Sequence, residues 1–126
     1  MAIRIDSGRT RDAINAILAE YGDAAIDAIQ EASKDTAKEV VKELKKAGDF
    51  NGGNDFRKGW AQKTESTRFG ASAVVYNKTK PGLAHLLEFG HAKQNGGRTK
   101  AFNFIAPINE TVETKFLENF EKHMGG

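Results

Sequence analysis

The most constraining feature of the sequence is residues 9–47, a stretch that contains no proline and a single glycine, Gly22. It consists mainly of Ala, Glu, Lys, Ile and Leu, which have high helix propensity. Ser7 or Thr10 can cap its start, and Gly48 can end it in a left-handed conformation. The stretch therefore predicts one long helix, with a bend allowed at Gly22.

The apolar residues of this stretch do not form one straight stripe. In its second half they recur every four residues, and each step overshoots the helical turn by about 40°, so the stripe winds around the helix. Two explanations fit this pattern: the helix curves around its own domain, or part of it packs on a neighbouring subunit. The interface residues expected under the second explanation are Val40, Val41, Leu44, Phe102 and Phe104.

Charged residues of the same stretch also follow helical rows. The acidic row consists of Asp23, Asp27, Glu31, Asp35, Glu39 and Glu43. The basic row consists of Lys34, Lys38, Lys42 and Lys46. Both rows advance by four residues, so they wind around the helix together with the apolar positions.

The next part of the chain predicts a small sheet. Residues 48–55 contain two Asn and three Gly and predict a loop. Residues 56–65 and 71–77 predict two strands, joined in an antiparallel hairpin around residues 66–70.

Two more helices follow. Residues 82–90 predict a short helix, and residues 105–124 predict a closing helix with Pro107 in its first turn. The apolar face of the closing helix consists of Val112, Phe116, Leu117 and Phe120. We therefore predict an α+β fold with a long N-terminal helix, a small antiparallel sheet, a short middle helix and a C-terminal helix, in a single domain over residues 1–126.

Composition argues against several classes of protein. Of the 126 residues, 39% are apolar and 29% are charged, and no apolar run reaches the roughly 20 residues that span a bilayer. The N-terminus lacks the apolar segment of a secretory signal, so we expect a protein made in the cytoplasm that has no membrane partner. Because the sequence has no cysteine, disulfides, thiolate metal sites and a cysteine nucleophile are excluded.

The motif HLLEFGH, residues 85–91, is the strongest candidate for a metal site, because two histidines flank a glutamate. The helical zinc signature needs two histidines four residues apart, whereas here the second histidine falls beyond a glycine that ends the predicted helix. A metal-dependent hydrolase at this motif stays an alternative, but we expect no metal. We interpret the motif as structural, fixing a short helix and its exit turn through His85, Glu88, Gly90 and His91.

Other patterns that carry chemistry are missing. No serine lies in a glycine-flanked elbow, and NGGRTK at residues 95–100 lacks the glycine spacing of a phosphate-binding loop. We therefore expect no enzymatic activity and no cofactor.

Positive charge is concentrated in the middle of the chain. Residues 51–100 carry 9 Lys and Arg against 3 Asp and Glu, whereas residues 1–50 carry 8 against 10 and residues 101–126 carry 2 against 4. The basic residues of two predicted loops there are Lys78, Lys80, Lys93, Arg98 and Lys100. These residues either keep the surface soluble or contact phosphates without reading bases. A small sequence-independent nucleic-acid-binding protein, using basic loops at residues 78–100, is therefore one function that the sequence allows.

Residues 77–97, NKTKPGLAHLLEFGHAKQNGG, and the later FIAPINE resemble the head-to-tail joining family of long-tailed bacteriophages and prophages, the tail-completion or neck proteins. In that family a long N-terminal helix, a strand pair, a His-Leu-Leu-Glu-x-Gly-His segment, an Asn-Gly-Gly-Arg loop and an Ile-x-Pro before the last helix follow in this order. The matching positions here are His85, Leu86, Leu87, Glu88, Gly90, His91, Asn95, Gly96, Gly97, Arg98, Ile105 and Pro107. After Arg98 this chain has TKAFNF, where relatives have a Pro-rich segment and a histidine.

The resemblance implies a structural virion protein that joins head and tail and acts through subunit interfaces around the DNA channel. It implies a homo-oligomeric ring, commonly a hexamer, at the neck or tail top of the virion. The partners that it implies are head-completion or adaptor proteins and tail-tube or tail-terminator proteins. Under this expectation the basic loop residues face the DNA lumen or a neighbouring ring.

Overall fold

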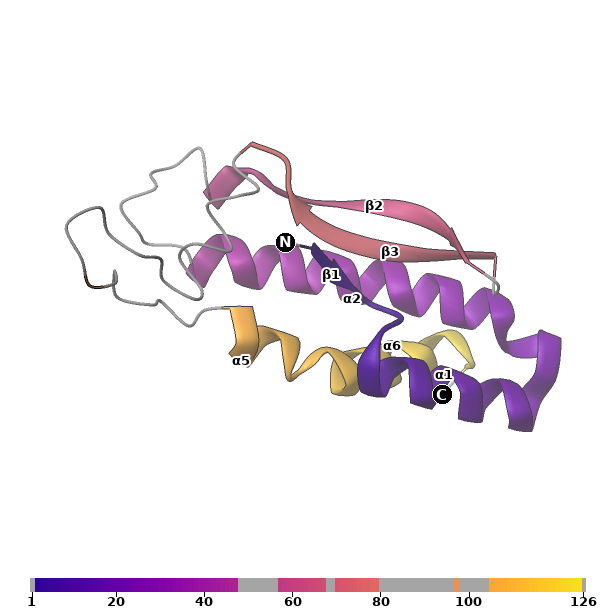
Figure 1. Cartoon of the computed structure of the whole chain (residues 1–126). Coiled ribbons are helices and arrows are strands. Elements are labelled where there is room, and N and C mark those ends of the chain that lie inside the picture. The colour runs from indigo at the N-terminus through magenta and orange to yellow at the C-terminus, as the bar shows by residue number, and fades with distance from the viewer. Residues whose placement is uncertain (1, 48–56, 68–69, 80–96, 98–104, 126) are drawn as a thin grey trace.

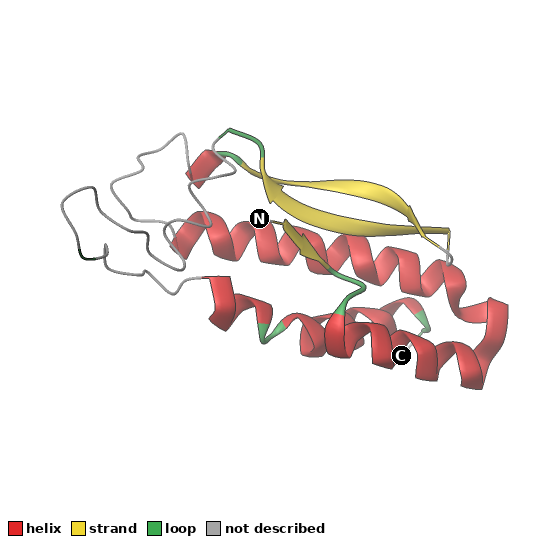
Figure 2. Cartoon of the chain, in the orientation of Figure 1, coloured by secondary structure: helices red, strands yellow, loops and turns green. Residues whose placement is uncertain are grey.

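The chain folds around one long helix, with a small sheet on one side of it and the other helices on the opposite side (Figure 1). The computed structural model describes residues 2–47, 57–67, 70–79, 97 and 105–125. Figure 2 shows the sheet as one outer layer and the helices as the rest of the body. This architecture confirms the predicted α+β fold class. The predicted middle helix, residues 82–90, lies outside the described residues.

The predicted N-terminal helical stretch consists of two helices, α1 (Gly8–Tyr21) and α2 (Ile26–Ala47), joined by the 3-10 turn η1 (Gly22–Ala25). Gly22 has a φ of 63°, and its amide donates to the carbonyl oxygen of Leu18. Because a positive φ costs little only for glycine, Gly22 ends α1 instead of merely bending a continuous helix. The chain turns at η1, and α2 runs back in the direction opposite to α1 (Figure 1).

The start of α1 also differs in detail from the prediction. Ser7 occupies the N-cap position with an extended backbone, but its hydroxyl donates to the carbonyl oxygen of Arg4 at 2.7 Å instead of accepting from the helix. Thr10 lies inside α1 and is buried. Neither residue therefore provides the predicted side-chain cap.

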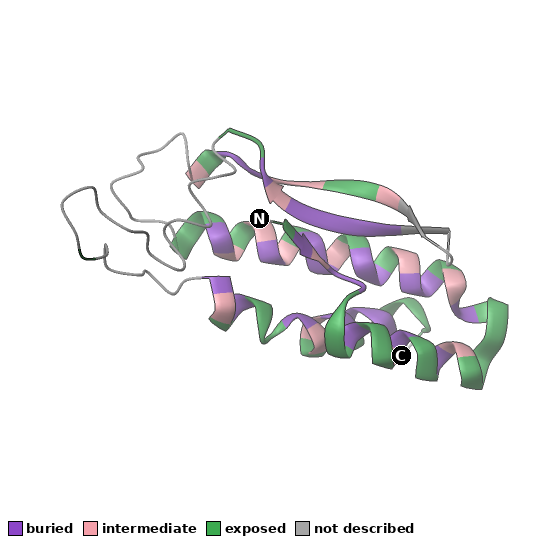
Figure 3. Ribbon diagram, in the orientation of Figure 1, coloured by how far each residue is buried: buried purple, intermediate pink, exposed green. Residues whose placement is uncertain are grey.

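The winding apolar stripe lies within α2 and is accommodated by the wide buried face of that helix, while α1 has a separate buried face. The face of α1 consists of Thr10, Ile14 and Ile17. The face of α2 consists of Ala28, Ile29, Ala32, Ser33, Thr36, Ala37, Val40 and Leu44. The wide face of α2 is covered by the sheet on one side and by the C-terminal helices on the other (Figure 3).

The sheet has three antiparallel strands in the order β1-β3-β2: β1 (Ala2–Arg4), β2 (Trp60–Thr67) and β3 (Gly70–Asn77). The predicted hairpin is confirmed, with Thr67 paired to Gly70 at its closed end. Strand β1 was not predicted, because three residues are too few to show the alternation of a strand. Its Ile3 pairs with Val75, and the amide of Ile5 donates to Ala73 at 3.1 Å.

The closing helix is divided into α5 (Ile105–Asn109) and α6 (Val112–His123). At the break, both the amide and the hydroxyl of Thr111 donate to the carbonyl oxygen of Ile108, at 3.0 and 2.7 Å. Such local bonds compete with the regular helical ladder. The predicted burial of Val112, Phe116 and Phe120 is confirmed, but that of Leu117 is wrong: its side chain is 36% exposed, and Asn119 is buried on that helix instead.

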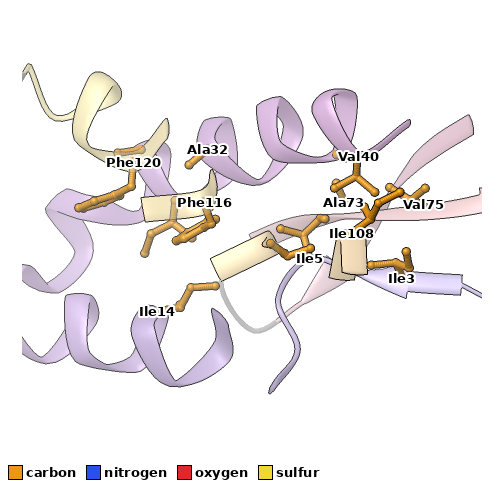
Figure 4. Packing of buried hydrophobic residues seen from close by; sticks show 14 of the residues in the cluster. Ile3, Ile5, Ile14, Ala32, Val40, Ala73, Val75, Ile108, Phe116 and Phe120 are labelled. Carbon is orange, nitrogen blue, oxygen red and sulfur yellow. The ribbon is translucent and has the colours of Figure 1, made fainter. Parts of the chain in front are cut away.

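The hydrophobic core is continuous from the sheet to α1. Figure 4 shows Ile14 facing Phe116 and Phe120, while Val40 lies near Val75 at the sheet. The rings of Phe116 and Phe120 stack with centroids 6.5 Å apart. These contacts tie both helical layers and the sheet into one body.

We predict that Leu44→Ala lowers the free energy of unfolding by about 2–5 kcal/mol, because Leu44 is fully buried and its truncation leaves a cavity. Lys42→Ala, at an exposed site on the same helix, should change it by less than about 0.5 kcal/mol. Urea unfolding followed by circular dichroism measures both values. Equal stability of the two variants would contradict the placement of Leu44 in the core.

Candidate functional site

The subunit interface predicted on α2 falls into two parts. Val40 and Leu44 are 0% exposed and belong to the chain's own core, whereas Val41 is half-buried at its edge. A second subunit cannot contact the first two side chains while this chain stays folded. The assignment of Val40 and Leu44 to an interface is therefore corrected, and Val41 keeps an accessible side chain. Phe102 and Phe104 lie outside the described residues.

Helices α2 and α6 are joined by a row of polar contacts. In its centre the side-chain amide of Asn119 donates to Thr36 Oγ1 at 3.1 Å and to Glu39 Oε1 at 3.2 Å. At one end Nε2 of His123 lies 2.6 Å from Asp35 Oδ2, and at the other Nζ of Lys115 lies 2.8 Å from Glu43 Oε1. We call this set the α2–α6 ladder: Asp35, Thr36, Glu39, Glu43, Lys115, Asn119 and His123.

The ladder was missed in the sequence, although a signal for it is present. Lys115, Asn119 and His123 are four residues apart, as are the acidic residues that they meet, and two antiparallel helices bring such rows together in reverse order. The sequence shows both rows but not which one is paired with which. Only the packing of α6 on α2 shows that half of the acidic row is used inside the chain.

Most of the basic side chains of α2 therefore have no acidic partner among the described residues. Lys34, Lys38 and Lys42 are exposed, as are Lys45 and Lys46 in the last turn. Within the described part of the chain, Lys34 lies 3.6 Å from Glu31, and the other four lysines contact no carboxylate within ion-pair distance. Lys38, Lys42, Lys45 and Lys46 thus give this face of α2 a positive charge that no described carboxylate pairs with.

A second charged group lies on the outer face of the sheet. Arg4 donates to Glu65, and Nζ of Lys63 lies 3.4 Å from the same carboxylate and 5.2 Å from the Tyr76 ring centroid. The hydrogen bond from Arg4 lowers the pKa of Glu65, and Lys63 adds to this effect, while partial desolvation opposes it. The network lies beside Val74, which pairs with both Arg4 and Lys63 and is only 2% exposed.

Of the predicted basic loop residues, the structure describes only Lys78. Its side chain is exposed, and its amide donates to the carbonyl oxygen of Gly59 at 2.9 Å. The buried Asn77 fixes the same corner, because its Oδ1 accepts from the amide of Thr79 at 3.2 Å and from its hydroxyl at 3.0 Å. Lys78 therefore lies at a well-defined end of β3. Lys80, Lys93, Arg98 and Lys100 lie outside the described residues.

The HLLEFGH motif cannot be compared with its prediction, since His85, Glu88, Gly90 and His91 lie outside the described residues. Among the residues that are described, no three His, Asp or Glu side chains converge in a way that could hold a metal ion. No described helix combines the length and apolarity that a membrane crossing needs.

An open cleft of about 510 Å³ lies where the start of α1 meets the break between α5 and α6. Two arginines and two glutamates line it, so its charges largely balance and do not select an anion or a cation. Its lining consists of Arg4, Ser7, Gly8, Arg9, Thr10, Asn109, Glu110, Val112 and Glu113.

We predict that Asn119→Ala lowers the free energy of unfolding by about 1–3 kcal/mol, because Thr36 is 0% exposed and loses its described partner. Lys122→Ala, exposed on the same helix, should cost less than about 0.5 kcal/mol. Chemical unfolding of the two variants measures the difference. A cost for Asn119→Ala no larger than for Lys122→Ala would show that the ladder does not stabilise the fold.

We predict that Arg4→Gln raises the pKa of Glu65 towards its ordinary value, with a smaller rise for Lys63→Gln. Because the folded-state pKa is lowered, the contribution of this pair to stability is complete above the ordinary carboxyl pKa and is lost as pH falls through the lowered one. Carboxyl-carbon NMR titration follows Glu65 directly. An unchanged pKa in Arg4→Gln would contradict the hydrogen bond.

One protein-family comparison relates this chain to known proteins. The family described as "Bacteriophage HK97-gp10, putative tail-component" matches residues 12–90, which is more than half of the chain. The match runs from α1 through the sheet and reaches the end of the predicted middle helix. No curated protein and no solved structure gives a significant match. The family confirms the resemblance to phage tail-completion proteins, and the chain belongs to the HK97-gp10-like family of bacteriophage tail components.

Proposed function

We propose that this tail component is part of a homo-oligomeric ring, a hexamer, that joins head and tail at the neck of the virion. The observation that carries this proposal is the family match over residues 12–90, which supports a structural role in the phage tail. The partners are head-completion or adaptor proteins on one side and tail-tube or tail-terminator proteins on the other. The ring surrounds the channel through which DNA passes.

The proposed role needs surfaces and no catalysis. The described body offers a firm support for such surfaces, because α2 is fixed to the sheet through the core and to α6 through the ladder. Weak contacts between copies become stable when ring and partner rings are present together, since each bound partner stabilises the assembled form by mass action. We propose that the protein is not an enzyme.

One end of the body is a suitable place for the partner ring or the DNA. The end of α2, the end of β3 and the start of α5 lie together there (Figure 1). Lys78, the one predicted basic loop residue that the structure describes, lies at this end of β3 and is exposed.

We predict that a phage lacking this protein accumulates filled heads and complete tails that stay unjoined, because the connecting ring is missing. Supplying the full chain in the host should restore joined, infectious particles. Electron microscopy and plaque titre measure the two outcomes. Joined particles in the absence of the protein would refute the neck assignment, and tails that fail to form at all would place the protein elsewhere in the tail.

A binding experiment separates this function from that of a small nucleic-acid-binding protein using residues 78–100. We expect the isolated chain to bind short duplex DNA weakly, if at all, at low salt. Tight binding with a steep salt dependence would favour the alternative function, because phosphate contacts release counterions.

A further inference from the structure

The exposed side of α2 carries a narrow seam with a defined spacing. Its members are Lys34, Lys38, Val41 and Lys45. The steps of four, three and four residues are those of a helix–helix packing seam and keep the four side chains on one side of the helix. Three lysines thus surround one accessible apolar residue over about 16 Å of helix.

The exposed side of α6 carries a second seam, in which acidic residues take the place of the lysines. Its members are Thr114, Leu117 and Glu121 on α6 and Met124 directly after it, at steps of three, four and three residues, with Glu118 beside them. Leu117 is 36% exposed and Met124 41% exposed, which makes them two of the few large apolar side chains on the described surface. This seam is about 15 Å long and matches the first one in length.

The two seams point away from each other within one chain. Residues of the ladder fill the sides of α2 and α6 that face each other, and on α6 the seam lies on roughly the opposite side of the helix from Lys115 and Asn119. One copy therefore cannot bring its own seams together. Two surfaces of this kind at different places on one molecule give a head-to-tail contact, which repeats from copy to copy.

We infer that the α2 seam of one copy binds the α6 seam of the next, with Val41 against Leu117 and the lysines against Glu118 and Glu121. This contact rests on the proposed ring function and names the surfaces that form the ring. Apolar side chains lie at its centre and charges at its rim, as in many specific protein interfaces. The charges select the partner and the register more than they add affinity.

A polyanion is a poorer occupant of the α2 seam than a second copy. Carboxylates also lie beside the seam: Glu31 is 3.6 Å from Lys34, and the paired side chains of Asp35 and Glu43 are 38% and 41% exposed, so a phosphate would meet negative charge as well as the lysines. Lysines in the last turn also stabilise the helix dipole, but this effect fades within one turn and does not account for Lys34 and Lys38 in the middle of α2. A helix that carries both acidic and apolar side chains can pair with the lysines of the seam and also cover Val41.

Charge reversal tests the contact with the full chain. We expect the wild-type protein to associate reversibly in sedimentation velocity, more strongly at low salt. Lys38→Glu with Lys45→Glu, or Glu118→Lys with Glu121→Lys, should each weaken association at least about tenfold, since like charges then face each other. Mixing the two variants should restore it, because every α2 seam then finds an oppositely charged α6 seam.

A control and a covalent test complete the design. Arg9→Glu with Lys58→Glu makes the same charge change as the lysine reversal, at exposed sites outside both seams, and should associate like the wild type. Because the chain has no cysteine, the double variant Val41→Cys with Leu117→Cys should form disulfide-linked dimers, trimers and longer oligomers on mild oxidation. A mixture of the two single variants should form mainly linked dimers.

Several results would overturn the inference. These are a wild-type chain that stays monomeric up to millimolar concentration at low salt, reversed variants that associate normally, or a control that is equally impaired. Failure of this kind is distinguishable from failure of the proposed function, which is measured by the joining of heads and tails in the phage. If phage that carry a charge-reversed variant still form joined particles, the inferred seam contact is wrong, and the neck role stays in place.

Discussion

The fold depends on the burial of one helix face, that of α2, between two unlike partners. Ala73 and Val75 cover it from the sheet, and Phe116 and Phe120 cover it from α6. Burying each large apolar side chain contributes about 1.5–3 kcal/mol, so removing either partner would leave half of a wide apolar face in water. The small residues along α2, such as Ala32 and Ala37, let both layers approach the helix closely.

Polar contacts decide how these layers are aligned. Ser33 Oγ accepts from the amide of Ala73 at 3.0 Å and lies 3.0 Å from the hydroxyl of Ser72, which fixes α2 along β3. Asn119 does the same between α6 and α2. Buried polar groups of this kind are costly when unpaired, so they favour one alignment over its neighbours. The surfaces that face outward are therefore held in fixed positions.

The main elements could be predicted because their signals are local. Residues 9–47 lack proline, the hairpin strands alternate, and Val112, Phe116 and Phe120 recur at helical spacing. The misses have non-local causes: β1 exists only because β3 offers it a partner, and Leu117 lies outward because α2 and α1 pack against another side of α6. Val40 and Leu44 were placed at an interface because one sequence cannot tell a side chain that meets its own sheet from one that meets another subunit.

By itself the sequence determined the helical and strand segments, the absence of thiol chemistry and the resemblance to phage joining proteins. These depend on residue type and spacing along the chain. Only the tertiary structure decided that the chain reverses at Gly22, that half of the acidic row of α2 is paired with α6 and that the lysines of α2 face away from α6. The physical reason is that a helix shows its charge rows in sequence, but which row meets a partner is set by the packing of segments that lie far apart in the chain.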